Sequence, residues 1–391
     1  MNLQSWLDQF GDSGALLLGA SDFPGGAASW LAEEPSETVE LQAGDEEGLR
    51  QALRRHRGGT GGWVGFISYE FGLPFVHEEP GAHAWPAAML RYYPDLRRLP
   101  TEAIDAGAPT KSPQLPLRPE DSEALHAERI RTLRERLVAG DVYEANLTRR
   151  FRGPAVEPRD LFRSLAQHAP APYAAWFNTP AGAIVSNSPE AFLHLDAEGR
   201  VSTFPIKGTR PRHGDAERDE VLRRELRQDK KELAEHLMVV DLLRNDLGRV
   251  CRAGSVHCGE LFEVVAYPGL WHMVTRISGR LRPEIDRASL LAQTLPAGSI
   301  TGAPKRAAVQ QIQALEAGPR GPYCGVFVVA PDDGSMTASV LIRTALCGPD
   351  DTVVQAGGGI VLGSKPDAEC RETWLKLRNF TGAAAAGEPM P

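Results

Sequence analysis

Cysteine is scarce in this chain. Five cysteines occur in 391 residues, an odd number, and no two of them form a C-x-x-C pair. That usage excludes a disulfide-framed domain and a zinc ribbon, because both need paired cysteines at short, regular spacing. We therefore expect reduced thiols in a cytoplasmic protein. The five residues are Cys251, Cys258, Cys324, Cys347 and Cys370.

Long apolar runs and an excess of positive charge are also absent. The first residues lack the basic start of a signal peptide, and the apolar stretch 15–20 is too short to span a membrane. The net charge of -8 provides no general attraction to nucleic acid or to an anionic membrane. We expect neither as a partner, and an anionic substrate would need local cations to hold it.

The remaining composition is that of a globular protein with ample core. Hydrophobic residues make up 42% of the chain and charged residues 24%. A proline-rich connection, 106–120, separates an N-terminal part, 1–105, from a longer region, 121–381, against which we expect it to pack. Residues 382–391 are small and polar, and we expect them to form a disordered tail.

Strand and helix patterns alternate along the chain. Apolar stretches separated by turn residues predict a strand at 62–69, one meander over 174–206 and a second over 324–355. Since hairpins pair strands in opposite directions, these meanders indicate antiparallel sheets covered by helices, an α+β fold. Helices are predicted at 121–139, 215–228, 229–248, 286–294, 304–316 and 366–380.

Lys207 is the first candidate for chemistry. A strand-like run, 201–206, ends there, and Gly208 allows a sharp backbone turn. Burial and the like charges of Arg210 and Arg212 would lower the pKa of this amine, and a neutral lysine is a nucleophile. The alternative is an ordinary solvated lysine in a basic loop.

Two predicted helices each carry glutamates three residues apart. Glu232 and Glu235 are on one of them, and Glu369 and Glu372 are on the other. Four carboxylates on two helices could hold a hard cation such as Mg2+, which takes few carboxylates, keeps waters and bridges to an anionic substrate. The alternative for each pair is a solvated helix face.

Three further polar residues stand in or beside apolar segments. Arg343 lies in an apolar strand pattern, where a guanidinium needs an anionic partner, either a structural carboxylate or a ligand. His272 is either a core histidine or part of a site. Glu190 follows Ser188-Pro189 at a strand end, where it either faces the same cleft as Lys207 or belongs to a simple turn.

Two glycine-containing segments could approach a ligand. The segment 296–305 opens a helix, whose free amides bind carboxylates or phosphates, or it is a plain cap with Thr301 or Ser299 as capping residue. It lacks the lysine-serine end of a Walker A loop. A strand also runs into three glycines, 357–359, which serve either close approach of a ligand or a bulge.

Together these segments resemble the chorismate-utilising enzymes, the family of anthranilate, aminodeoxychorismate, isochorismate and salicylate synthases. The resemblance covers about 121–380 and the strand at 62–69. It implies a large α/β sandwich of two facing antiparallel-rich sheets flanked by helices. The matching segments are 140–143, 188–190, 234–242, 244–246, 298–305 and 357–361.

The resemblance implies a role for each candidate residue. The Mg2+ ligands would be Glu235 and Glu372, with Glu232 and Glu369 reaching the ion through waters. The residues that bind substrate would be Thr301, Tyr323, Arg343, Lys376 and the amides of Gly357 and Gly358. The catalytic residues would be Lys207, Glu190 as an acid or base, and His272 beside the substrate ring.

Two positions bear on the type of reaction. Lys207, in the sequence Pro-Ile-Lys-Gly-Thr, resembles the aminodeoxychorismate synthase type, whereas anthranilate-type members carry Ala there. Members that activate water carry Lys, and ammonia users usually carry Gln, where this chain has Glu144. The resemblance thus implies amination of chorismate through Lys207, on the route to para-aminobenzoate and folate. The alternatives are an anthranilate-type component and a non-catalytic chorismate-binding subunit.

A source of ammonia is not evident in the chain. A glutaminase nucleophile would sit in a Gly-x-Cys-x-Gly elbow, and none of the five cysteines does. We therefore expect a separate glutamine amidotransferase subunit to supply ammonia.

Overall fold

The computed structural model describes residues 1–20, 28–54, 59–100, 104–108, 110–267 and 270–382. Of the predicted tail, 382–391, only the first residue is described, so that prediction lies outside the described residues. The proline-rich connection is described except for residue 109 and contains one short strand, β7 (Arg118–Pro119).

Two large sheets make up most of the fold. In the described residues the first sheet has the order β18 (Gly302–Ala303), β8 (Glu144–Pro154), β22 (Asp351–Ile360), β21 (Thr344–Cys347), β10 (Gly182–Ser188), β9 (Tyr173–Thr179), β1 (Ala15–Leu18), β2 (Ser29–Ala32) and β6 (Leu96–Leu99), with β7 paired to β8. The second sheet has the order β14 (His257–Cys258), β17 (Ile277–Arg280), β12 (Arg200–Thr203), β11 (Ala191–Leu195), β20 (Met336–Val340), β19 (Val326–Pro331), β4 (Gly62–Ile67), β5 (Ala88–Tyr93) and β3 (Glu37–Leu41). A small third sheet joins β13 (Ile206–Pro211), β16 (Leu270–Val274) and β15 (Glu263–Tyr267). These described strand pairings are all antiparallel.

Helices are described throughout the chain. They are α1 (Leu3–Phe10), α2 (Glu46–Arg54), η1 (Tyr69–Val76), α3 (Glu123–Ala139), α4 (Pro158–His168), α5 (Ala216–Gln228), α6 (Lys230–Val250), α7 (Arg287–Thr294), η3 (Gly298–Ile300), α8 (Lys305–Leu315) and α9 (Pro366–Thr381). All six predicted helices are present, with ends shifted by at most two residues. Several begin where a polar side chain accepts a backbone amide hydrogen bond, because the first turn of a helix leaves its amides unpaired. These caps are Ser122, Asp215, Asp229 and Asp286.

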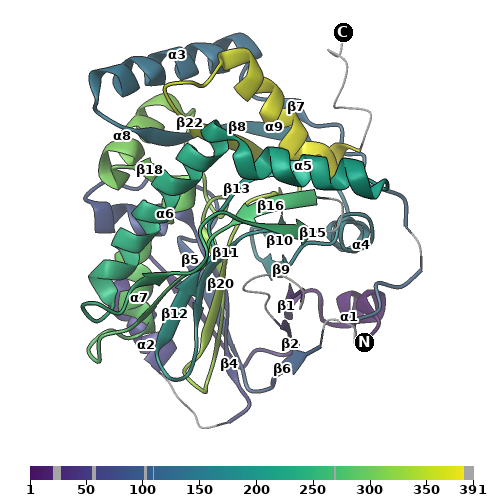
Figure 1. The fold of residues 1–391 in the computed structure, drawn as a ribbon. Coiled ribbons are helices and arrows are strands. Elements are labelled where there is room, and N and C mark those ends of the chain that lie inside the picture. The colour runs from purple at the N-terminus through teal and green to yellow at the C-terminus, as the bar shows by residue number, and fades with distance from the viewer. Residues whose placement is uncertain (21–27, 55–58, 101–103, 109, 268–269, 383–391) are drawn as a thin grey trace.

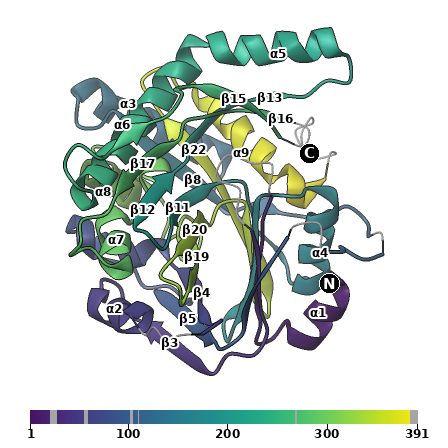
Figure 2. The same ribbon diagram turned by 60° about the horizontal axis from the view of Figure 1, so that its bottom comes forward.

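The two large sheets face each other across a shared core. Phe66 and Phe327 of the second sheet pack in one cluster with Phe177 and Ile184 of the first, and the rings of Phe66 and Phe177 lie 5.8 Å apart. Helices α2, α6 and α7 cover the outer face of the second sheet, and α1, α4 and α9 cover that of the first (Figures 1 and 2). The expected α+β sandwich is confirmed.

The predicted meanders are wrong in their sheet assignment. Strands β9 and β10 lie in the first sheet, but β11 and β12 lie in the second, and the chain crosses between them at Pro189. It crosses back between β20 and β21, over 341–343. The crossings are adjacent, because Val340 donates its amide to the carbonyl of Glu190 at 3.1 Å. Turn residues show where a strand ends, but they do not show which sheet the next strand joins.

Two predicted strands are interrupted at candidate residues. The strand expected to contain Arg343 breaks there, and Arg343 has a left-handed backbone with φ 48. The strand expected over 201–206 ends at Thr203, and Lys207 lies in the next strand, β13, rather than after a strand end. Gly208 then shifts the pairing register with φ 72, a conformation that glycine adopts without strain.

Two expectations from composition can be compared with the structure. None of the helices in the described ranges is long and apolar enough to cross a bilayer. All five cysteines are free, and Cys258 alone among them is not fully buried.

One buried arginine, Arg320, contacts several helices and a strand of the first sheet. Arg320 donates from Nη1 to the carbonyl of Ile300 at 2.9 Å and from Nη2 to the carbonyl of Asn146 at 2.6 Å. Its guanidinium also pairs with Glu316 at 2.7 Å, and its backbone amide donates to Glu70 at 2.7 Å. Arg320 therefore connects β8, η3 and η1 with Glu316, the residue that follows α8, at one buried point.

Replacing Arg320 should destabilise the fold strongly. Arg320→Met leaves Glu316 buried without its counter-ion, which costs about 3–5 kcal/mol. Urea unfolding followed by circular dichroism measures this change in the free energy of unfolding. Arg131→Met on α3, which removes an exposed arginine, serves as control and should stay within about 0.5 kcal/mol of the parent protein. Equal stability of the two variants would contradict a structural role for Arg320.

Candidate active site

The candidate site forms where the first turns of α6 and α9 meet strands β13 and β22. Asp229 caps α6 by accepting hydrogen bonds from the amides of Lys231 and Glu232 at 3.0 and 3.2 Å. Pro366 begins α9, at a position where its missing amide removes no helical hydrogen bond. Helix α6 contacts β13, and α9 contacts β22. Glu232 of α6 lies close to Gly208 of β13, and Glu372 of α9 lies close to Gly358 of β22.

The glycines of β22 let charged side chains of α9 approach the strand. A Cβ at Gly358 would lie 3.2 Å from Glu372 Oε1, 3.4 Å from Lys376 Nζ and 3.6 Å from Glu369 Oε2. Lys376 also donates from Nζ to the carbonyl of Gly357 at 2.7 Å. Strand β22 pairs with β8 in unbroken register through all three glycines, so they permit close approach and do not form a bulge.

Lys207 lies on the other side of these glycines, in contact with a carboxylate. Its Nζ donates to Glu144 Oε1 over 2.9 Å, and a Cβ at Gly359 would lie 2.1 Å from that oxygen. Burial alone would lower the pKa of Lys207. The negative charge of Glu144, followed by those of Glu235 and Glu190, outweighs burial and raises the pKa above its ordinary value. The amine is thus a cation held by carboxylates.

The predicted effect of the arginines on Lys207 is therefore wrong. Arg210 donates to Asp229 Oδ2 at 2.8 Å, and Arg212 donates to Asp219 Oδ2 at 2.9 Å. Each guanidinium is thus paired with a carboxylate of its own. The arginines do not depress the pKa of the lysine, because their charge is already offset.

The glutamates predicted as metal ligands repel one another within each helix. Burial raises the pKa of Glu235 and of Glu369, and the neighbouring charges of Glu232 and Glu372 raise them further. Burial also acts to raise the pKa of Glu372, but Lys376, with Nζ 2.7 Å from its Oε1, lowers it overall. The cluster therefore holds more negative charge than its lysines offset.

This cluster has the donor chemistry of a Mg2+ site. Glu235 Oε1 is buried and accepts no hydrogen bond, and Lys231 Nζ lies 3.5 Å from it. An unsatisfied carboxylate oxygen among crowded carboxylates suits a hard divalent cation. Within the described ranges no three His, Cys, Asp or Glu side chains already converge as a metal-binding group. The carboxylates would have to turn from their lysines toward the ion.

Glu190 and Arg343 lie at the two crossings between the sheets. Burial raises the pKa of Glu190, while a hydrogen bond from Ser299 and the charges of Lys207, Lys376 and Arg343 act in the opposite direction. Glu190 is thus electrostatically coupled to three cations of the site. Its raised pKa suits a side chain that donates a proton.

The remaining predicted residues are mostly buried. Burial, followed by the charge of Arg343, lowers the pKa of His272 to about 4, so its ring is neutral at pH 7. Its Nδ1 lies 3.1 Å from Thr209 Oγ1. Thr301 donates its hydroxyl to a backbone carbonyl at 2.9 Å, and Tyr323 is buried. Thr301 therefore already has an acceptor within the fold.

Three side chains of the site were not among the predicted site residues. Glu144 was noted only as a departure from the family pattern, Ser299 only as a possible helix cap, and Lys231 not at all. A carboxylate at the buried start of a long strand is the one signal that could have singled out Glu144.

Comparison with known sequences gives a consistent result. Residues 22–382 match the family described as chorismate binding enzyme. An aminodeoxychorismate synthase of Streptomyces pristinaespiralis is 39% identical over 259 residues, which are 66% of this chain and 36% of that protein. Anthranilate synthase component 1 of Haloarcula marismortui is 40% identical over 258 residues, 66% of this chain and 53% of that protein. The matched region thus spans between about a third and a half of these relatives.

Comparison with solved structures agrees. The crystal structure of anthranilate synthase component I from Streptococcus pneumoniae superposes with a TM-score of 0.78 at 26% identity, covering 93% of this chain and 94% of that chain. Both the sequence and the fold therefore lead to one conclusion: the chain belongs to the chorismate binding enzyme family.

Proposed function

We propose that this chain aminates chorismate at C4 to give 4-amino-4-deoxychorismate, as component I of an aminodeoxychorismate synthase. The observation that carries the proposal is Lys207, partly buried and paired with Glu144 beside the predicted metal ligands. Relatives named for the two aminations match almost equally, at 39% and 40% identity, so overall similarity does not choose between them. Lys207 favours the C4 reaction, because the anthranilate type resembles this chain except for an alanine at that position.

Capture of chorismate depends on local positive charge. Chorismate carries two carboxylates, and the chain has a net charge of -8. Arg343 and Lys376, with the amides near Gly357 and Gly358, are the groups that would hold those carboxylates. Mg2+, bound by Glu235 and Glu372 and through waters by Glu232 and Glu369, would supply further positive charge when present.

The first chemical step would join Lys207 to the ring. Glu144 accepts a proton from the ammonium of Lys207, which leaves a neutral amine. The amine adds at C2 as the ring double bonds shift and the C4–O bond breaks. Glu190, whose pKa burial raises, gives its proton to the departing hydroxyl, which leaves as water.

The second step would reverse the first with a different nucleophile. Ammonia adds at C4, the double bonds shift back, and the C2–N bond to Lys207 breaks. The lysine takes back its proton from Glu144, and ammonia loses one to Glu190, so both residues regain their starting state. Ammonia would come from a separate glutamine amidotransferase subunit, and the product would serve para-aminobenzoate and folate synthesis.

Product identification tests the proposal directly. The protein is incubated with chorismate, Mg2+ and an ammonium salt, and the products are separated and identified by mass spectrometry. We expect 4-amino-4-deoxychorismate. Anthranilate as the main product would establish the alternative amination. Chorismate binding without turnover, in protein that is folded, would establish a non-catalytic subunit.

Substitution of Lys207 shows whether this residue acts as a nucleophile or contributes only its positive charge. Lys207→Arg keeps the charge and removes the nucleophile, and Lys207→Ala removes both. Both variants should lower formation of the 4-amino product by on the order of a thousandfold or more. If Lys207→Arg kept substantial 4-amino activity, direct attack of ammonia would be the better account.

The pKa of Lys207 should respond to Glu144. Glu144→Gln removes the carboxylate that most raises this pKa. The pKa falls because the opposing effect of burial is then less fully offset. At any pH below about 10 a larger fraction of the amine is then neutral. Acetylation of the Lys207 peptide, followed by mass spectrometry across pH, should show its midpoint at lower pH in Glu144→Gln than in the parent and in the exposed control Glu225→Gln. An unchanged midpoint would show that Glu144 does not hold the proton.

Metal removal should stop turnover and spare the fold. Excess chelator, or Glu235→Gln or Glu372→Gln, should lower activity and weaken its dependence on Mg2+ together, because each glutamine removes a charged ligand. Circular dichroism should show an unchanged fold, and Glu225→Gln on α5 should behave as the parent. Full activity in excess chelator would exclude a metal requirement.

A further inference from the structure

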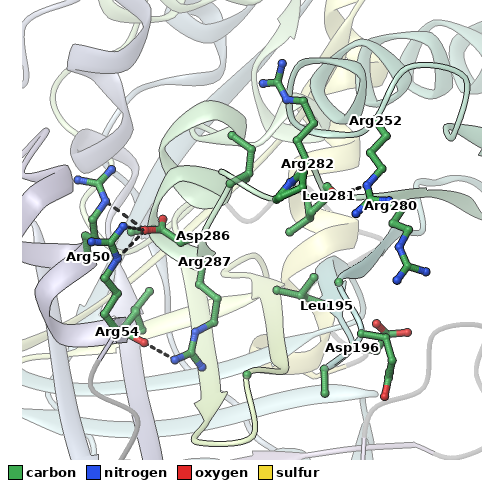
Figure 3. Close-up of a pocket in the computed structure, with 18 residues that line it drawn as sticks. Arg50, Arg54, Leu195, Asp196, Arg252, Arg280, Leu281, Arg282, Asp286 and Arg287 are labelled. Atoms are coloured by element: carbon green, nitrogen blue, oxygen red, sulfur yellow. Dashed lines mark hydrogen bonds and ion pairs between the residues drawn. The ribbon is translucent and has the colours of Figure 1, made fainter.

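A cavity lined by charged and apolar side chains lies outside the candidate active site. It has a volume of about 320 Å3 and is enclosed by α2, α7, the turn between β11 and β12, and the end of β17 (Figure 3). None of its lining residues belongs to the site described above. Six arginines line it: Arg50, Arg54, Arg252, Arg280, Arg282 and Arg287.

The acidic residues of the cavity do not balance these arginines. Asp286 pairs with Arg50 at 3.1 Å and with Arg54 at 3.0 Å, on one side of the cavity (Figure 3). Asp196 accepts a backbone amide of its own turn at 2.7 Å. Glu198 is the one other acidic lining residue. Asp286 and Asp196 thus already have hydrogen-bond or ion-pair partners. Arg252, Arg280 and Arg282 lie on the side of the cavity away from Asp286 (Figure 3).

Three arginines of the cavity have no carboxylate partner. Within the described part of the chain, no Asp or Glu oxygen lies within 4.0 Å of the guanidinium of Arg252, Arg280 or Arg287. Arg287 is 7% exposed, and it donates to backbone carbonyls, including that of Pro331 at 2.8 Å. Arg287 is near the charges of Asp332, Asp333 and Asp286. Arg252 and Arg280 are exposed, so these two guanidinium groups are the ones available to an anionic ligand.

The cavity also has an apolar floor, defined as its apolar lining residues. They include Leu195, Leu281, Leu53 of α2 and Ala288 of α7. Its volume is at the lower end of the range that holds small molecules. A concave site of this size admits a small ligand more readily than a protein surface or a nucleic acid duplex.

We propose that this cavity binds a small molecule bearing a phosphate group. Planar guanidinium groups donate paired hydrogen bonds that match phosphate oxygens, and several arginines around one cavity can contact several oxygens at once. A chain of net charge -8 repels a free anion, so capture must come from this local cluster. The apolar floor would contact the carbon skeleton of the ligand. The proposal is independent of the reaction proposed for the active site.

Calorimetric titration with inorganic pyrophosphate tests the proposal. The titration is done at low ionic strength and without divalent cations, and again with sulfate at the same ionic strength. We expect saturable binding of one pyrophosphate per chain, with sulfate binding at least about tenfold more weakly because it offers fewer charged oxygens.

Cavity variants locate the bound anion. Arg280→Ala and Arg252→Ala, both at exposed positions, should each weaken pyrophosphate binding by about tenfold or more, the contribution of one hydrogen bond to a charged group. Arg131→Ala on α3 removes the same charge elsewhere and should bind as the parent does. Absence of saturable binding, or equal affinity in all three variants, would overturn the proposal. Unchanged thermal unfolding of the variants shows that a loss of binding is not a loss of fold.

Discussion

The ion pair between Lys207 and Glu144 is the interaction on which the candidate site depends. A buried carboxylate and a partly buried ammonium each cost free energy without a counter-ion, so each stabilises the other. Within the pair, the charge of Lys207 acts to lower the pKa of the nearby Glu235, and the charge of Glu144 acts to raise it. Gly359 gives the pair room, since any side chain at that position would collide with the carboxylate oxygen. Lys207, Glu144 and Gly359 therefore depend on one another and form one unit.

The architecture brings the other polar groups to this unit. Both crossings of the chain between the two large sheets lie next to each other, and they place Glu190 and Arg343 there rather than in the middle of a strand. Helices α6 and α9 cover different sheets, and α6 contacts β13 while α9 contacts β22. Glu190 and its three neighbouring cations, Lys207, Lys376 and Arg343, thus come from segments that are far apart in the sequence.

Local features of the fold could be predicted from the sequence, and long-range ones could not. Helix ends follow from caps such as Asp229, whose effect is confined to a few neighbouring residues. The charge state of Lys207 was predicted wrongly because Arg210, three residues away, is visible in the sequence. Its partner Asp229 and the carboxylate of Glu144 are separated from the lysine by long stretches of chain. The two glutamate pairs suggested a shared ion, but spacing along one helix carries no information about another, so only the family resemblance gave each glutamate a role as ligand.

The central claim is that Lys207 forms a covalent bond to the substrate ring. The most direct measurement is peptide mass spectrometry of protein quenched with acid after exposure to chorismate and Mg2+ without ammonia, when the nucleophile that attacks C4 and releases the lysine from C2 is missing. The account predicts a modified peptide containing Lys207, heavier by the mass of chorismate less one water, which disappears when ammonium is added before the quench. An unmodified Lys207 in protein that still forms the 4-amino product under the same conditions with ammonium would contradict it.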